Sequence, residues 1–183
     1  MKVDSIGLVE LSSIATGFLV GDMMIKASSV KILEALPICP GKFIVLVGGQ
    51  VADVINAVEV GVEYAGDSIV DSFIIPRIHH QVFAAINAVT DISKIEALGI
   101  VETFTIAAGI IAADAAVKAA AVDLVEIRLS RGQGGKAYFT LTGEVGAVQA
   151  AVEAGVAEVI HSGLVVKYVI IPSPHGELLD FLY

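Results

Sequence analysis

Cys39 is the residue of this 183-residue chain best suited to chemistry, because a cysteine thiolate can bind a metal or attack an electrophile. It is the single cysteine, so the chain can form no internal disulfide. Pro37 and Pro40 stiffen the segment around it, and Gly41 permits a tight turn. Lys42 adds a positive charge that would attract a thiolate. The alternative is that Cys39 is simply a small buried residue.

A single thiolate cannot hold an iron–sulfur cluster, which needs several ligands. Three thiolates gathered around a three-fold axis would supply most of them. The sequence therefore allows a cluster at Cys39 only if copies of the chain meet there.

The remaining motifs argue against an enzyme. Residues 132–137 match the dinucleotide pattern G-x-G-x-x-A, but the residues that follow predict a strand, whereas that fingerprint opens a helix. Four histidines could suggest a metal, yet His79 and His80 are adjacent and would point in different directions in an extended segment. No Ser-His-Asp or Cys-His combination emerges. We therefore expect no catalytic residues.

Composition limits the partners. Apolar residues make up 56% of the chain, charged residues 17%, and the mean hydropathy is +0.83, which excludes disorder. No window reaches the roughly 18 to 20 apolar residues of a membrane span, and the first residues lack a signal-peptide pattern. A net charge of −9 argues against nucleic acid. We expect a cytoplasmic protein whose surplus apolar surface is buried in a homo-oligomer.

The chain contains an internal duplication. Residues 6–34 and 98–126 are identical at 11 of 29 aligned positions, and the offset of 92 grows to 96 through two short insertions. The duplication predicts two domains, residues 1–92 and residues 93–183.

Each copy is predicted to be an α/β unit of the order β-α-β-β-α-β, the ferredoxin-like arrangement. In the first copy, apolar runs predict strands and periodic stretches predict helices. The expected strands cover residues 6–11, 30–36, 42–47 and 69–75. The first expected helix is capped by Ser12 or Ser13 and runs to about Ala27, and the others cover residues 51–62 and 81–88. A loop over residues 37–41 joins the second strand to the third.

In order, spacing and duplication, these residues resemble the tandem-domain shell proteins of bacterial microcompartments. The resemblance covers essentially the whole chain and follows the unpermuted type. It is carried by the strand at residues 6–10 with its copy at 98–102, by the Asp-x-x-x-Lys-Ala helices at 22–27 and 114–119, by the Gly-Lys pairs at 41–42 and 135–136, and by the ends at 75–79 and 171–175. Within this family the sequence is most similar to the iron–sulfur shell trimers of propanediol-utilisation microcompartments.

The resemblance implies a homotrimer whose six modules imitate a hexameric tile, packed with other shell proteins around encapsulated enzymes. Lys26, Lys118 and Arg77 match the residues that make contacts at the tile edge, and Ser173 replaces the arginine in the second copy. The loops that match the central pore contain Ile38, Cys39, Pro40 and Gly41 in the first copy, and Arg131, Gly132, Gln133 and Gly134 in the second.

The same resemblance implies one 4Fe–4S cluster per trimer, bound by Cys39 of each chain on the three-fold axis, with electrons passed across the shell to a redox enzyme. Two alternatives stay open. One is a tile with an open or gated pore that conducts small metabolites without a cluster. The other is a soluble ferredoxin-like trimer that binds a ligand and regulates another process.

Overall fold

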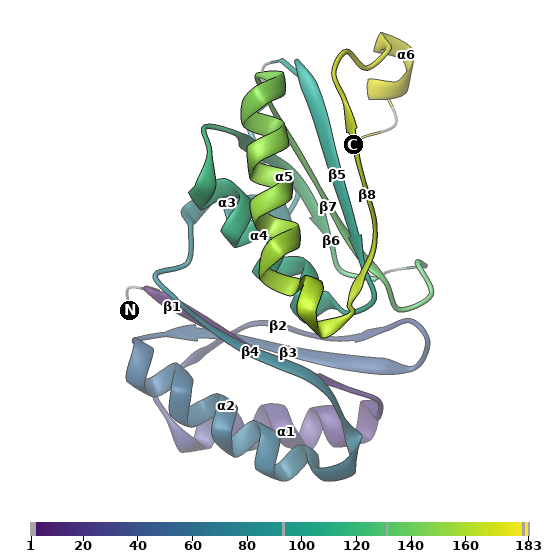
Figure 1. Cartoon of the computed structure of the whole chain (residues 1–183). Helices are drawn as coiled ribbons and strands as arrows, with labels where there is room; N and C mark the ends of the chain where they lie inside the picture. The colour runs from purple at the N-terminus through teal and green to yellow at the C-terminus, as the bar shows by residue number, and fades with distance from the viewer. Residues whose placement is uncertain (1–2, 93, 131, 181, 183) are drawn as a thin grey trace. The chain divides into compact units, whose positions relative to one another are not determined.

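The computed structural model describes residues 3–92, 94–130, 132–180 and 182, and it separates them into two compact units (Figure 1). The first unit contains the residues up to Ile78 together with Ser130–Gly135. The second contains residues 79–129 and the chain from Lys136 onward. The domain boundary expected between residues 92 and 93 stays a prediction, because it divides the sequence by repeat, whereas the compact units exchange short segments.

The first unit follows the expected order of elements. It consists of β1 (Ser5–Leu11), α1 (Ile14–Ala27), β2 (Lys31–Ile38), β3 (Lys42–Gly49), α2 (Val51–Ala65), the short 3₁₀ helix η1 (Gly66–Ser68) and β4 (Ile69–Pro76). The strands form an antiparallel sheet in the order β2-β3-β1-β4, and α1 and α2 lie against it (Figure 1). The βαββαβ prediction is confirmed.

The second unit repeats this arrangement. It consists of α3 (His80–Ile86), β5 (Ala97–Thr103), α4 (Ile106–Ala119), β6 (Asp123–Arg128), β7 (Ala137–Gly143), α5 (Val145–Val159), η2 (Ile160–Ser162), β8 (Val165–Ile171) and α6 (Gly176–Leu179). Its sheet has the order β6-β7-β5-β8, again with antiparallel neighbours. The equivalent strand order in both units confirms the duplication as a structural one.

The first helix of each copy begins at a hydroxyl cap. The Ser13 side chain accepts a hydrogen bond from the backbone N–H of Thr16 at 3.3 Å, and Thr105 accepts one from that of Ala108 at 3.1 Å. Each cap satisfies an amide that the first turn would otherwise leave unpaired. The local sequence therefore sets where α1 and α4 start.

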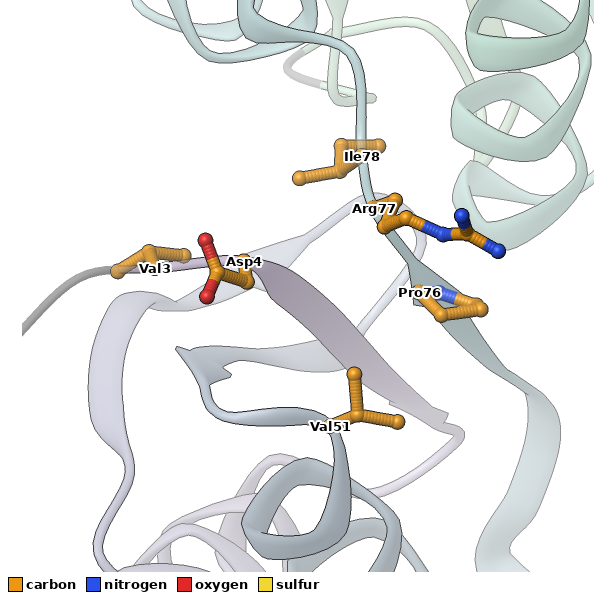
Figure 2. Close-up of a pocket in the computed structure, with 6 residues that line it drawn as sticks. All are labelled: Val3, Asp4, Val51, Pro76, Arg77 and Ile78. Atoms are coloured by element: carbon orange, nitrogen blue, oxygen red, sulfur yellow. The ribbon is translucent and has the colours of Figure 1, made fainter.

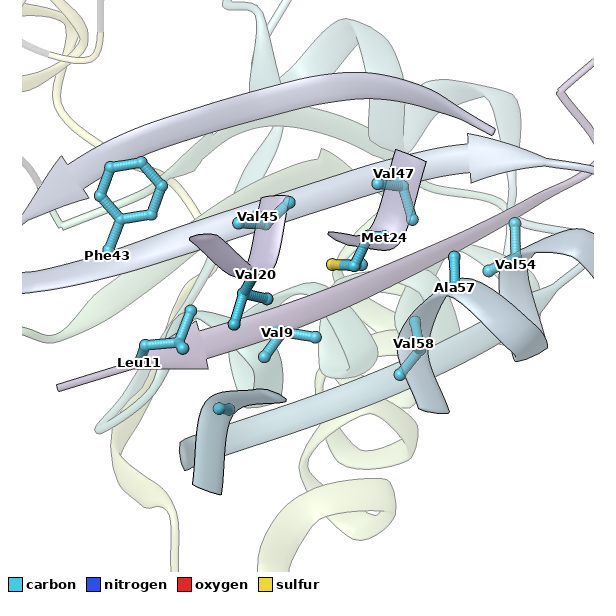
Figure 3. Packing of buried hydrophobic residues seen from close by; sticks show 11 residues of the cluster. Val9, Leu11, Val20, Met24, Phe43, Val45, Val47, Val54, Ala57 and Val58 are labelled. Carbon is cyan, nitrogen blue, oxygen red and sulfur yellow. The ribbon is translucent and has the colours of Figure 1, made fainter. Parts of the chain in front are cut away.

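The core of the first unit lies between its sheet and its two long helices, as Figure 3 shows. Val9 of β1, Val45 of β3 and Met24 of α1 are fully buried there. Gly17 of α1 belongs to this packing, because a Cβ atom at this position would come within 2.4 Å of the ring of Phe43. A glycine that lowers helix propensity is thus needed where α1 crosses β3. Among the described residues, no helix is both long enough and apolar enough to cross a membrane.

Candidate functional site

Cys39 lies at the tip of the hairpin that joins β2 and β3. The last paired residues of that hairpin are Ile38 and Lys42, so the turn consists of Cys39, Pro40 and Gly41. The predicted loop over residues 37–41 is therefore too long, because β2 continues through Pro37 and Ile38 at a sheet edge, where proline is tolerated. Gly41 has φ of +73°, which its lack of a side chain permits.

The exposure of this turn favours a role in binding. Ile38 is buried and anchors the hairpin, whereas Pro40 and Gly41 are exposed. Cys39 is partly exposed and its thiol is free. The expectation of a small buried residue is therefore not met, because a three-residue turn leaves the cysteine outside the core.

The glycine-rich loop of the second copy lies beside this hairpin, within the first compact unit. Ser130 is fully buried, Gly132 and Gly134 are exposed, and Gln133 is intermediate. Gly135 is buried against the hairpin. Of the residues expected to line a pore, Arg131 falls outside the described residues.

The sequence suggested that the charge of Lys42 would act on Cys39, but in the structure Lys42 is engaged by other groups. Its ammonium group forms an ion pair with the carboxylate of Glu10 and donates a weaker hydrogen bond, 3.4 Å long, to the carbonyl oxygen of Gly135. Glu10 is completely buried in β1, so its charge requires a partner. The equivalent pair of the second unit, Lys136 and Glu102, is 3.0 Å long and partly exposed.

The two expected edge lysines occupy equivalent positions in the last turns of α1 and α4. Lys26 pairs with Asp22, and Lys118 pairs with Asp114, one helical turn earlier in each case. Lys26 is exposed, whereas Asp114 is buried and also accepts a hydrogen bond from the backbone N–H of His79 at 2.8 Å. The two lysines therefore occupy equivalent positions, but Lys26 pairs with a partly exposed aspartate and Lys118 with a buried one.

Arg77, the expected edge arginine, directly follows β4 and has φ of +54°. It lines an open pocket of about 710 Å³ whose six lining residues are shown in Figure 2: Val3, Asp4, Val51, Pro76, Arg77 and Ile78. The pocket lies where β1 and α2 begin and β4 ends. Ser173, the counterpart of Arg77 in the second copy, is exposed.

The histidine pair differs from the sequence-based expectation. The rings of His79 and His80 lie close together, with centroids 4.4 Å apart and planes tilted by 38°, because α3 begins at His80 and only His79 is extended. Burial and the neighbouring His80 lower the pKa of His79. Within the described residues, no group of three or more His, Cys, Asp or Glu side chains could hold a metal.

The sequence placed residue 130 in the pore loop but did not predict the hydrogen bonds between Cys39 and Ser130. Its burial and its left-handed backbone, with φ of +52°, come from packing between residues that are 91 positions apart. One sequence signal could have indicated a special role for this segment: the loop of the second copy is two residues longer than that of the first and is rich in glycine.

A family model for the BMC domain matches this chain twice, over residues 5–78 and 97–174. The chain therefore belongs to the BMC-domain family, as the resemblance predicted. The bacterial microcompartment shell protein PduT of Citrobacter freundii is 44% identical over 174 residues, which cover 95% of this chain and 95% of PduT. The shell protein EutM of Escherichia coli K12 is 43% identical over 83 residues, 45% of this chain and 84% of EutM.

Solved structures of microcompartment proteins share the fold of this chain. A crystallised microcompartment protein from Desulfitobacterium hafniense DCB superimposes with a TM-score of 0.89 at 51% identity, over 98% of this chain and 99% of the other. A fused permuted hexameric shell protein of the RMM microcompartment, at 22% identity and a TM-score of 0.65 over 85% of this chain and 81% of the other, shares the fold. This chain is a structural shell protein of a bacterial microcompartment, and its curated relatives are shell proteins and not enzymes.

Proposed function

We propose that three copies of the chain form one shell tile, and that their cysteine hairpins meet on its three-fold axis to bind one 4Fe–4S cluster. The observation that carries this proposal is the placement of Cys39. Its free thiol is partly exposed at the tip of a hairpin, where a ligand outside the subunit can reach it. A thiolate is also the donor that iron–sulfur clusters require.

The donor set fits the cluster only in an assembly. Each chain contributes one thiolate, and the described residues contain no group of three or more His, Cys, Asp or Glu side chains that could hold a metal. Three Cys39 side chains would bind three of the irons, and an external ligand would complete the fourth. The cluster would supply one-electron chemistry, exchanging electrons with a redox enzyme on one side of the shell.

Exposed apolar side chains support the assembly itself. Phe18 and Leu19 of α1 are 68% and 49% exposed, and Phe104 is 51% exposed. Exposed large apolar side chains are the kind that protein–protein contacts bury. In each unit they favour subunit contacts in the proposed trimer.

The test is anaerobic purification followed by iron and sulfide analysis. We expect four irons and four sulfides for every three chains, with broad visible absorbance. Both should disappear in Cys39→Ser, which must still form the oligomer that light scattering gives for the wild type. The cluster would be contradicted if the wild-type protein, prepared without oxygen and after cluster reconstitution, contained no iron and had no colour. That result would not contradict the proposed shell tile.

A tile with a conducting pore is the second candidate, and Gly132 and Gly134 favour it. Both are exposed, and an added Cβ atom would meet nothing within 4 Å at either position. If this loop lines an open pore, Gly134→Trp should slow metabolite entry into intact microcompartments. The variant should leave shell assembly unchanged, and unaltered flux would count against the pore.

A further inference from the structure

The loop Ser130–Gly135 is joined to the second repeat by sequence but belongs to the first compact unit by its contacts. Its two ends lie against the residues of the cysteine turn. The first end hydrogen-bonds the backbone of Cys39, and the other packs on Pro40 and Lys42. The loop therefore contacts each side of the turn without contributing a thiol.

Ser130 holds Cys39 through two hydrogen bonds in opposite directions. The backbone N–H of Cys39 donates to the carbonyl oxygen of Ser130 at 3.2 Å, and the Ser130 hydroxyl donates to the carbonyl oxygen of Cys39 at 3.4 Å. Ser130 is fully buried and has φ of +52°, a conformation that costs a residue with a side chain free energy. The surrounding packing therefore fixes both polar groups of the Cys39 backbone.

Gly135 packs against the other side of the Cys39 turn. A Cβ atom at this position would lie 3.0 Å from Cδ of Pro40 and 3.1 Å from the carbonyl oxygen of Cys39, closer than ordinary van der Waals contact. Its own carbonyl oxygen accepts the hydrogen bond from Lys42. A side chain at position 135 would therefore require the cysteine turn to shift by a few tenths of an ångström, and it would also strain the backbone of residue 135.

We propose that the loop 130–135 is a clamp that positions the Cys39 turn, with Ser130 and Gly135 as its positioning residues. The clamp explains why the second repeat has a longer glycine-rich loop where the first has a cysteine turn. Its effect on a bound cluster rests on the proposed function above, whereas its effect on the Cys39 backbone does not.

The first experiment uses iron-free wild-type protein and follows hydrogen exchange of the Cys39 amide. Loss of one hydrogen bond shifts a local opening equilibrium by roughly fivefold, so Ser130→Ala should speed this exchange about fivefold. Gly135→Ala should speed it at least as much. The matched control is Gly132→Ala, because Gly132 also has a left-handed backbone, with φ of +80° against +90° at Gly135, but no atom within 4 Å.

Two outcomes would overturn the clamp. The Cys39 amide could exchange as fast in the wild type as an unprotected amide does, or Gly132→Ala could accelerate exchange as much as Gly135→Ala. Either result would show that the loop does not hold the turn, whether or not the protein binds iron.

The second experiment uses anaerobically purified protein. Ser130→Ala and Gly135→Ala should shift the reduction potential and alter the electron paramagnetic resonance spectrum of the reduced cluster, because hydrogen bonds and ligand geometry around the sulfur set both. Gly132→Ala should change neither, and all three variants should keep the wild-type oligomeric state. Unchanged spectra and potentials in both clamp variants would contradict a positioning role. An iron-free wild type alone would instead contradict the proposed function.

Discussion

The ammonium group of Lys42 neutralises the carboxylate of Glu10, which is fully buried in the central part of the first sheet. Lys42 is also the first residue of β3 after the cysteine turn. The ion pair therefore ties the turn end of the hairpin to the neighbouring strand β1. In the second unit, Lys136 and Glu102 form the same pair with side chains that are 42% and 35% exposed.

This difference predicts unequal costs for removing the two lysines. Lys42→Met removes the Lys42 ammonium group from the buried Glu10 carboxylate and should lower the free energy of unfolding by about 3 kcal/mol. Lys136→Met is the matched control and should cost at most about 1 kcal/mol, because solvent screens an exposed pair. Urea unfolding of both variants measures the difference. Equal losses would show that burial does not distinguish the pairs.

Two glycines of α5 offer a second matched comparison. A Cβ atom at Gly155 would come within 2.5 Å of the backbone oxygen of Ala112 in α4, and a backbone cannot yield as a side chain does. Gly155→Ala should therefore destabilise the protein by about 1 to 3 kcal/mol. Gly146→Ala meets nothing within 4 Å and should stabilise it by about 0.5 to 1 kcal/mol, through higher helix propensity.

Thermal unfolding of the two alanine variants checks this prediction. A stable Gly155→Ala variant would mean that α4 and α5 separate more easily than their packing indicates.

Apolar runs, helical periodicity and the duplicated motifs were enough to predict the order of strands and helices in both units. Local signals also predicted the start of α1, because Ser13 caps it within its own sequence. The environment of Cys39 could not be predicted in the same way. The contacts of Ser130 and Gly135 with the cysteine turn join residues more than 90 positions apart, and no local pattern encodes such distant packing. The close contact between the rings of His79 and His80 was likewise missed, because α3 begins one residue earlier than periodicity suggested.

The resemblance implies that Lys26 lies at the tile edge, and we therefore predict that Lys26→Ala stops the protein from forming extended sheets. Lys26 is 66% exposed and pairs only within its own helix turn among the contacts described, so the substitution should cost no more than about 0.5 kcal/mol of stability. Electron microscopy would show the loss of sheets, and light scattering would show intact oligomers. Sheets of normal extent would contradict a role for this lysine at the edge.

Lys118→Ala should stop sheet formation as well but is a less clean test. Its partner Asp114 is buried and also binds the backbone of His79, so removal of Lys118 should lower the unfolding midpoint more than Lys26→Ala does. Comparing the two midpoints separates the edge effect from the folding effect. A midpoint for Lys118→Ala no lower than that for Lys26→Ala would contradict this ranking.

The lowered pKa of His79 predicts a pH dependence of stability. Burial and the adjacent His80 disfavour the charged form, and Lys118 acts in the same direction, while Asp114 opposes them. Unfolded chains bind the His79 proton near the ordinary value of 6.5, whereas the folded protein binds it only at lower pH. The unfolded state therefore holds more protons in that window, and the free energy of unfolding should fall as the pH drops through 6.5.

Unfolding midpoints of wild type and His79→Gln, compared from neutral to mildly acidic pH, measure this effect. The wild type should lose more stability on acidification than the variant does. Parallel curves would show that His79 does not contribute to the pH dependence.

The cysteine turn and the loop that packs on it are encoded in one polypeptide, and this fixes their stoichiometry. Each copy of the chain contains one turn with a thiol and one loop without it, so the level of expression cannot change their ratio of one to one. A shell protein of identical single modules would carry a cysteine in all of its loops or in none. Because the two modules are encoded in tandem, their loops can differ in length and composition, and only one of them carries a thiol.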